Sequence, residues 1–161
     1  MSCGGTQLKL YFVQHGEALA KHVDPDRSLS EAGRSDVEQL AVFLAAHIDV
    51  SRIMHSGKTR AQQTAEIISE SLKYETFIEV FNGINPNDPV EAFAQQLDDW
   101  NEDLLVVGHL PFMDRLVAYL LTGSAAESIV SYAPGSIVCL ASTADEGWRL
   151  HWMMRPELLS K

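Results

Sequence analysis

The stretch Leu104–Gly108, LLVVG, is a continuous run of apolar residues that leads directly into His109. Strands that are covered by helices on both faces have this composition, whereas strands with one wet face alternate apolar and polar residues. Working outward from it, Leu8–Gln14 (LKLYFVQ) and Arg52–Ser56 (RIMHS) contain many residues that favour strands. These three segments predict the parallel centre of a β-sheet.

Segments with helical periodicity separate the predicted strands. Glu31–His47 places its apolar residues on one stripe and has Ser30 before it as a suitable N-cap. Thr59–Leu72 forms a second stripe, and Pro89 and Pro111 each fit the first turn of a further helix. Three more strands are predicted, of which the last two form an antiparallel hairpin: Thr76–Val80, Ser136–Ser142 and Trp148–Met153. The alternation predicts a three-layer α/β/α fold with a mostly parallel sheet.

Length and composition indicate a single domain. The chain has 161 residues, and two separate cores would each have to form from fewer than about a hundred residues. Hydrophobic residues make up 46% and charged residues 21%, which is close to ordinary globular usage. No repeat or long linker interrupts the pattern. We therefore predict one domain over residues 1–161, with residues 1–7 as a flexible leader.

Several classes of protein are disfavoured by what the sequence lacks. Residues 1–7 do not resemble a signal peptide, and no stretch approaches the roughly 20 apolar residues of a membrane span, which predicts a cytoplasmic protein. The two cysteines, Cys3 and Cys139, suggest neither a disulfide framework nor a metal site. Neither is followed by the arginine that a cysteine phosphatase needs to cradle phosphate around a thiolate.

Charge and histidine spacing narrow the choice further. The formal net charge of −10 argues against binding to nucleic acid. Six of the twelve Lys and Arg residues nevertheless lie between Lys21 and Arg60, which permits a locally positive site. His22, His47 and His55 lack the spacing of metal ligands, so we predict no metal and expect these three histidines at the surface or in packing.

The predicted parallel strands are each followed by residues that can bind an anion. They are followed by Gln14-His15-Gly16, by His55-Ser56-Gly57 with Arg60 close behind, and by Gly108-His109. Ligands of open α/β sheets bind at the carboxyl ends of the strands, so these residues should line one crevice. Each histidine or arginine alone is more often a structural group than a catalyst. Three successive strand ends that all supply groups suited to an anion favour a functional site.

These residues resemble four motifs of the histidine phosphatase superfamily (phosphoglycerate mutase-like), and in particular its short SixA-type phosphohistidine phosphatases. The first strand of that family ends in Arg-His-Gly. Residues 26–33 (DRSLSEAG) resemble its Arg-Pro-Leu-Thr/Ser-x-x-Gly segment. Residues 56–64 (SGKTRAQQT) resemble its Ser-Pro-x-x-Arg-(Ala)-x-Gln-Thr, and residues 107–111 (VGHLP) its Val-(Gly/Ser)-His-x-Pro. The motifs follow the order and spacing of the family over nearly the whole chain.

The resemblance implies a fold and a set of roles. It implies a phosphoglycerate mutase-like domain without a cap domain, and a phosphatase that needs no cofactor. His15 is then the group that becomes phosphorylated, while Arg60 and His109 bind the transferring phosphoryl. A neutral imidazole is a good nucleophile near pH 7, and phosphoryl transfer needs mainly in-line positioning and fixed positive charge. If protonated, His109 adds charge and a donor.

The chain departs from the family at the residue before the nucleophile. Gln14 stands where the family has arginine, so its amide can bind phosphate through a hydrogen bond but without charge. Losing a charge-assisted bond costs about 1.5 to 3 kcal/mol, or roughly one to two decades in rate. Lys21, Arg27 and Lys58 are candidates to compensate from a loop.

A second departure concerns the acid that protonates the leaving group. Larger members carry a glutamate after the third strand, but residues 80–84 (VFNGI) contain no carboxylate. Glu17, Asp24 and Asp88 are candidates, although each reads more simply as a solvated loop residue. An alkoxide needs a proton donor to leave, whereas a protonated imidazole leaves readily as a neutral group. Phosphohistidine on a partner protein is therefore favoured as substrate, with inorganic phosphate as product.

Two other functions remain open from the sequence. The chain could be a catalytically weak module that binds a phosphorylated protein, with Gln14 marking the loss of turnover. It could also be a phosphatase of small phosphate esters. Membrane and nucleic-acid partners are not expected.

Overall fold

The computed structural model of the chain describes residues 7–143 and 145–160. Strands and helices alternate along the chain until an antiparallel hairpin and a short 3-10 helix end it. The elements are β1 Leu8–Gln14, α1 Glu31–His47, β2 Arg52–His55, α2 Thr59–Ser71, β3 Phe77–Val80, α3 Val90–Leu97, β4 Leu104–Gly108, α4 Phe112–Thr122, β5 Ile137–Thr143, β6 Gly147–Met154 and η1 Pro156–Leu158. Cys3 and all of the expected leader except Gln7 lie outside the described residues, so the leader and the domain bounds stay predictions.

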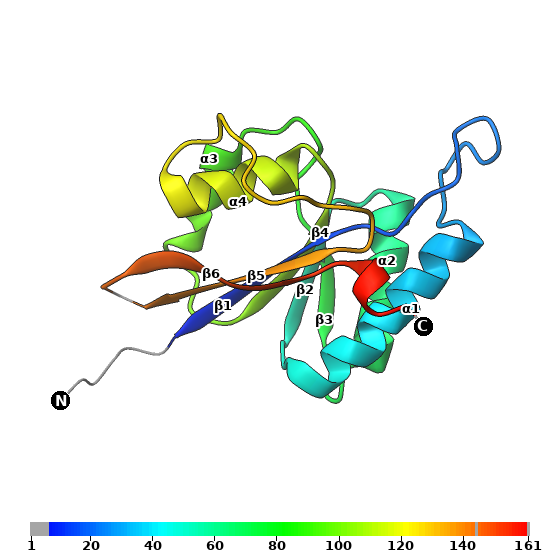
Figure 1. Cartoon of the computed structure of the whole chain (residues 1–161), viewed down its shortest axis with the longest axis horizontal. Coiled ribbons are helices and arrows are strands. Elements are labelled where there is room, and N and C mark those ends of the chain that lie inside the picture. Colours follow the sequence, from blue (N-terminus) through cyan, green and yellow to red (C-terminus); the bar gives the residue numbers. More distant parts are fainter. Residues whose placement is uncertain (1–6, 144, 161) are drawn as a thin grey trace.

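The six strands form one sheet in the order β3-β2-β4-β1-β5-β6. Strands β1 to β4 pair in parallel, while β5 runs antiparallel to both β1 and β6. Helices α1 and α2 cover one face of this sheet, and α3 and α4 cover the other (Figure 1). The predicted three-layer α/β/α fold with a mostly parallel sheet and a closing hairpin is confirmed.

Side chains of the central strands alternate between two hydrophobic cores. Tyr11 and Val13 of β1 pack on the side of α1 and α2, whereas Leu10 and Phe12 pack on the side of α3 and α4. Every residue of β4 is buried. A strand between two helical layers has no wet face, which explains why LLVVG is apolar throughout.

The helix starts follow the capping residues of the sequence. Ser30 Oγ accepts a hydrogen bond from the Gly33 N–H at 3.0 Å, so the predicted cap of α1 is confirmed. Pro89 and Pro111 occupy the N-cap positions of α3 and α4, one residue earlier than the first turn in which we expected them. Proline has no N–H to donate to the helix, so it fits either place.

Two glycines allow the chain after β1 to cross the first turn of α1. A Cβ atom on Gly33 would lie 2.1 Å from the carbonyl oxygen of Glu17, and one on Gly16 would lie 2.7 Å from Val37 Cγ2. The crossing is fixed by the Ser30 N–H, which donates to the same Glu17 oxygen at 2.9 Å. Close approach of backbone, and not a positive φ, therefore requires glycine here. This crossing holds the segment that begins with His15 against α1.

The two longest connections between elements meet the carboxyl edge of the parallel strands. Residues 15–30 follow β1, and residues 123–136 lead into β5, which runs antiparallel to β1 (Figure 1).

Within the described ranges, no helix has the length and apolar character needed to span a membrane.

Candidate active site

Neighbouring strands bring the predicted site residues to one edge of the sheet. Strands β2, β4 and β1 lie side by side, with Gln14 opposite Gly108 and His55 opposite Val107. The residues that follow these strand ends therefore share the carboxyl edge, as expected for a ligand site in a parallel sheet. We call the group formed by Gln14, His15, Ser56, Arg60 and His109 the histidine site.

The ring of His15 is held in one orientation. Its Nδ1 lies 2.7 Å from the carbonyl oxygen of Gly16, and its backbone N–H donates to the Gly108 oxygen at 3.0 Å. A carbonyl oxygen only accepts, so the proton of the neutral ring belongs on Nδ1. Nε2 is consequently left with its lone pair facing away from the backbone.

Arg60 approaches that lone pair from the first turn of α2. Its Nε donates to His15 Nε2 at 3.3 Å. Thr64, one turn later, ties the helix to the segment after β1, because its Oγ1 donates to the Arg60 carbonyl at 2.8 Å and accepts from the Gly16 N–H at 3.1 Å. The side chain of Arg60 is thereby held beside His15.

His109 completes the group from the end of β4. Its ring centroid lies 4.9 Å from that of His15, and its Nε2 lies 2.6 Å from Ser56 Oγ. The side chain is 1% exposed, and its Nδ1 has no hydrogen-bond partner among the described residues. A buried ring nitrogen without a partner is costly unless a ligand supplies one.

Burial keeps both rings neutral near pH 7. Desolvation lowers the pKa of His15 from 6.5 to about 4, with the nearby charges of Arg60 and Arg27 acting in the same direction. Desolvation lowers the pKa of His109 from 6.5 to about 3, followed by the repulsion that His15 would exert when protonated and by the charges of Arg60, Lys58 and Arg27. The option of a protonated His109 is therefore disfavoured until an anion is bound, because an anion would raise both pKa values again.

Gln14 is the buried residue that breaks the family pattern. Its side chain is 7% exposed, and its Oε1 has no hydrogen-bond partner among the described residues. The backbone around it is firmly held, because its N–H donates to Ser136 at 3.0 Å and its carbonyl accepts from Gly135 at 3.0 Å. Gln14 is thus a neutral amide fixed next to His15.

The three carboxylates considered as leaving-group acids are all engaged locally. Glu17 Oε1 accepts from Ser30 Oγ at 2.9 Å, and the Asp88 carboxylate accepts from the Asn85 N–H at 2.8 Å. Asp24 caps its own loop, where its carboxylate accepts from the N–H groups of Asp26 and Ser28. None of these contacts involves a residue of the histidine site.

The remaining histidines lie where packing or solvent accounts for them. His22, His47 and His151 are exposed, and His55 is buried with its Nδ1 accepting from the Gly57 N–H at 3.1 Å. Over residues 7–143 and 145–160, no three His, Cys, Asp or Glu side chains are placed to hold a metal ion.

Sequence reasoning did not assign a role to Ser56 or Thr64. Both belong to the segment SGKTRAQQT, and both contact residues of the predicted site through side-chain oxygens. Their positions in that motif were the indication in the sequence that both residues could belong to the site. The contacts themselves join residues 53 and 48 positions apart, so the sequence does not display them.

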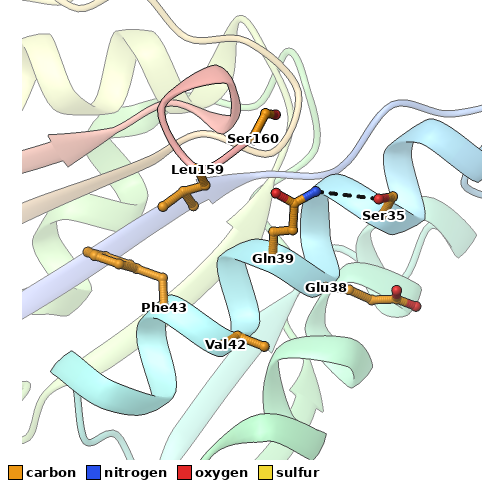
Figure 2. A pocket seen from close by; sticks show the side chains of 7 residues that line it. All are labelled: Ser35, Glu38, Gln39, Val42, Phe43, Leu159 and Ser160. Carbon is orange, nitrogen blue, oxygen red and sulfur yellow. Dashed lines mark hydrogen bonds between the residues drawn. The ribbon is translucent and has the colours of Figure 1, made fainter.

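A separate hollow of about 700 Å³ lies between α1 and the C-terminal segment (Figure 2). We call it the α1 hollow, and its lining consists of Ser35, Glu38, Gln39, Val42, Phe43, Leu159 and Ser160. Gln39 Nε2 donates to Ser35 Oγ at 3.4 Å, so two of its polar groups bond to each other. The lining contains no histidine, arginine, lysine or cysteine.

Comparisons with known proteins point to one family. The model of the histidine phosphatase superfamily (branch 1) matches residues 10–83. Phosphohistidine phosphatase SixA of Escherichia coli is 27% identical over 157 residues, which cover 92% of this chain and 94% of that protein. The SixA homolog of Haemophilus influenzae is 25% identical over 146 residues, covering 83% and 87%. The solved structure of the protein histidine phosphatase SixA complexed with tungstate superposes with a TM-score of 0.81 at 24% identity, covering 95% of this chain and all of that one.

Proposed function

We propose that this chain, which belongs to the histidine phosphatase superfamily, removes phosphoryl groups from phosphohistidine on a partner protein. The family and the phosphoglycerate mutase-like α/β fold predicted from four sequence motifs are confirmed. The relatives in two bacteria are named for phosphohistidine hydrolysis, which supports the same class of substrate here.

The observation that carries the proposal is the unprotonated Nε2 of His15 between Arg60 and His109. Because Nδ1 donates to the Gly16 carbonyl, Nε2 keeps its lone pair at neutral pH. Arg60 Nε lies 3.3 Å from that nitrogen and can move its donors onto phosphate oxygens. The nucleophile and the groups that neutralise developing charge are thus adjacent.

In the first step, His15 Nε2 attacks the phosphorus atom of the substrate. The P–N bond to the substrate imidazole breaks, and its electron pair stays on that imidazole nitrogen. The reacting form of the substrate is protonated on its other ring nitrogen, so the ring leaves as a neutral imidazole. Arg60 and His109 bind the equatorial oxygens of the transferring group, where charge is spread in the transition state.

In the second step, water attacks the phosphorus atom of phospho-His15. The P–Nε2 bond breaks, its electron pair returns to Nε2, and both protons of the water leave on the inorganic phosphate. The proton on Nδ1 stays in its bond to Gly16 throughout. The cycle needs no cofactor.

The choice of phosphohistidine over a phosphate ester rests on the leaving group. An alkoxide requires a proton from a positioned acid, and Glu17, Asp24 and Asp88 are each hydrogen-bonded within their own loops. An imidazole leaving group does not need that acid. A protein substrate and a cytoplasmic location remain parts of this proposal.

A second candidate function is favoured by Gln14. A buried neutral amide in place of the family arginine would suit a module that binds a phosphorylated protein and turns it over slowly. Small phosphate esters form a third class of substrate, which the experiment below includes.

Rapid-quench labelling tests the proposal. The purified protein is mixed with a ³²P-labelled phosphohistidine peptide, or with an activated aryl phosphate, and quenched under alkaline conditions that preserve phosphoramidates. We expect transient label on His15 with the peptide, followed by release of inorganic phosphate.

The matched controls are His15→Ala and His47→Ala, since His47 is an exposed histidine outside the site. Phosphate release by His15→Ala at the wild-type rate would refute the mechanism. Tight binding of the peptide without release would favour the binding module. Faster release from the aryl ester would favour a small-molecule phosphatase.

A further inference from the structure

The histidine site contains little fixed charge for the ligand that it is proposed to bind. A phosphoryl group carries about two negative charges near pH 7. Burial lowers the pKa of both His15 and His109 far enough to leave them neutral near pH 7, and Gln14 is an uncharged amide. Arg60 is then the single permanent cation among the five residues of the site. A second cation would have to come from a neighbouring segment.

The three cations considered from the sequence differ in how they are placed. Lys21 is exposed in the connection after β1, and Lys58 is exposed at the N-cap of α2. Arg27 is half-buried, although it belongs to the same connection as Lys21. A lysine free in solvent keeps its water and its rotamer freedom, so it is a poor fixed charge.

The loop of residues 19–28 holds Arg27 firmly. The Leu19 N–H donates to the Ser28 carbonyl at 2.8 Å, and Ala18 bridges Leu29 across the base of the loop. The Arg27 N–H donates to the Asp24 carbonyl at 2.9 Å, and the Asp24 carboxylate accepts from the Ser28 N–H at 3.0 Å. The loop is therefore an ordered structure, closed at its base and braced inside.

The base of this loop is joined to the helix that carries Arg60. The Leu29 N–H donates to Gln63 Oε1 of α2 at 2.8 Å. The other end of the same connection starts at His15, next to Arg60. Arg27 thus belongs to a connection that starts at His15 and is bonded near its other end to α2, the helix that carries Arg60.

Arg27 has an unusual backbone conformation. Its φ of 51° is the only positive value of a non-glycine residue in the described ranges. This left-handed conformation is unfavourable for an ordinary residue, and glycine or asparagine would adopt it more readily. Its side chain donates through Nε to the Leu19 carbonyl at 3.1 Å, which leaves the four N–H groups of the terminal nitrogens for other partners.

The charge of Arg27 affects the pKa of three residues of the histidine site. Burial is the main cause that lowers the pKa of His15, Arg60 and His109, and the positive charge of Arg27 adds to it at all three. Lys58 adds to it at His109 alone, where its effect is larger than that of Arg27. This separates Arg27 from the other two candidate cations.

We propose that Arg27 is the second fixed cation of the phosphoryl site and supplies, from the 19–28 loop, the charge that is missing at Gln14. This inference rests on the proposed function for the identity of the ligand. The guanidinium of Arg27, held by its Nε, turns its terminal N–H groups to the phosphoryl oxygens opposite Arg60. The fork geometry of arginine suits two oxygens of one phosphoryl group.

The test measures tungstate binding by calorimetry and phosphohistidine hydrolysis for four proteins. Arg27→Asn removes the charge but keeps a residue that tolerates a positive φ. Arg27→Lys keeps the charge, and Lys21→Asn is the matched control in the same loop. We expect Arg27→Asn to weaken tungstate binding about 10- to 100-fold, the loss of one charge-assisted bond. Arg27→Lys should retain most of the affinity, and Lys21→Asn all of it.

A double variant separates charge from loop structure. Gln14→Arg in the Arg27→Asn background should restore tungstate binding, because it returns a cation to the site from β1. A loss of affinity that Arg27→Lys and Gln14→Arg both fail to restore would mean that Arg27 only holds the loop, and would overturn the inference.

The outcomes also distinguish the inference from the proposed function. Arg27→Asn binding tungstate as tightly as the wild type would overturn the role of Arg27 and leave the phosphatase intact. Binding that depends on Arg27 in a protein that hydrolyses no phosphohistidine would uphold the role of Arg27 and reject the function. A wild type that binds no tungstate would overturn both.

Discussion

The histidine site and the α1 hollow differ in what they offer a ligand. The hollow has a volume of about 700 Å³, and Val42 on its lining is 69% exposed (Figure 2). The histidine site instead gathers two histidines and an arginine whose pKa values are all lowered by burial. Its buried nitrogen His109 Nδ1 has no partner in the described part of the chain.

The comparison shows that a functional site is better located by polar groups that come together than by the volume of a cavity. Polar groups on the hollow satisfy each other or face solvent, as Gln39 does with Ser35. Two buried atoms of the histidine site, Gln14 Oε1 and His109 Nδ1, have no hydrogen-bond partner among the described residues, which is a common property of functional sites. Apart from the prediction on pH, each prediction below compares a variant in or beside the histidine site with one in or beside the hollow.

Arg60→Ala should produce the largest effect. It removes the donor beside His15 Nε2, and loss of one such group costs roughly 10²- to 10³-fold in kcat. The matched control is Arg34→Ala, an exposed arginine on α1 one residue before Ser35 of the hollow. Steady-state hydrolysis of the phosphohistidine peptide measures both, and equal rates for the two variants would break the contrast.

Gly33→Ala should destabilise the protein by about 1 to 3 kcal/mol or more, the cost of overpacking a tight contact. Alanine normally stabilises a helix relative to glycine by roughly 1 kcal/mol, but its Cβ here would lie 2.1 Å from the Glu17 oxygen. Val42→Ala, later in the same helix, should change the free energy of unfolding by no more than about 0.5 kcal/mol. Urea unfolding compares them, and a neutral Gly33→Ala would show that the crossing is loose.

Lowering the pH should reduce the free energy of unfolding, because His15 and His109 are harder to protonate in the folded chain than in the unfolded chain. The pKa values of His15 and His109 fall from 6.5 to about 4 and about 3 on folding, mainly because of burial. Between these values and 6.5 the unfolded chain binds more protons, so the free energy of unfolding falls as the pH drops through that window. Above it both states are neutral at these groups and the contribution is constant.

Urea unfolding at about pH 7 and about pH 5 measures this effect. The variant that carries His15→Gln and His109→Gln should lose less stability between the two pH values than the wild type. Equal losses in the two proteins would mean that the site does not resist protonation.

Ser56→Ala should produce the smallest effect in the site. Its hydroxyl lies 2.6 Å from His109 Nε2, and a hydrogen bond of this kind contributes about 0.5 to 1.5 kcal/mol, or a factor of roughly 2 to 13 in kcat/KM. Ser35→Ala removes a hydroxyl of the α1 hollow and should leave kcat/KM unchanged. A greater loss with Ser35→Ala would reverse our ranking of the two regions.

Much of the fold was predictable because it depends on local sequence. The bounds of β1, α1 and β4 match the predicted segments, since periodicity and the cap at Ser30 act within one element. The starts of α3 and α4 differ by one residue from expectation because proline suits both the N-cap and the first turn. Local signals locate such an end only to within a residue or two.

The sequence predicted which residues form the site, but not their hydrogen bonds or their protonation. His15, Arg60 and His109 were expected at one sheet edge, and the structure brings them together with 3.3 Å between Arg60 Nε and His15 Nε2. Their roles in catalysis stay proposals. The contact of Ser56 with His109 and the proximity of Arg27 were not visible, because both join distant parts of the chain.

The sequence by itself determined the order of strands and helices, the buried centre of the sheet and the residue types at each strand end. These properties follow from side-chain periodicity and from strand-end residues, which belong to single elements. Only the tertiary structure decided that Nδ1 of His15 holds the proton, that burial lowers the pKa of both histidines, and that the charges of Arg60 and Arg27 both act on them. Protonation and charge depend on burial and on neighbours across the fold, and packing alone sets those.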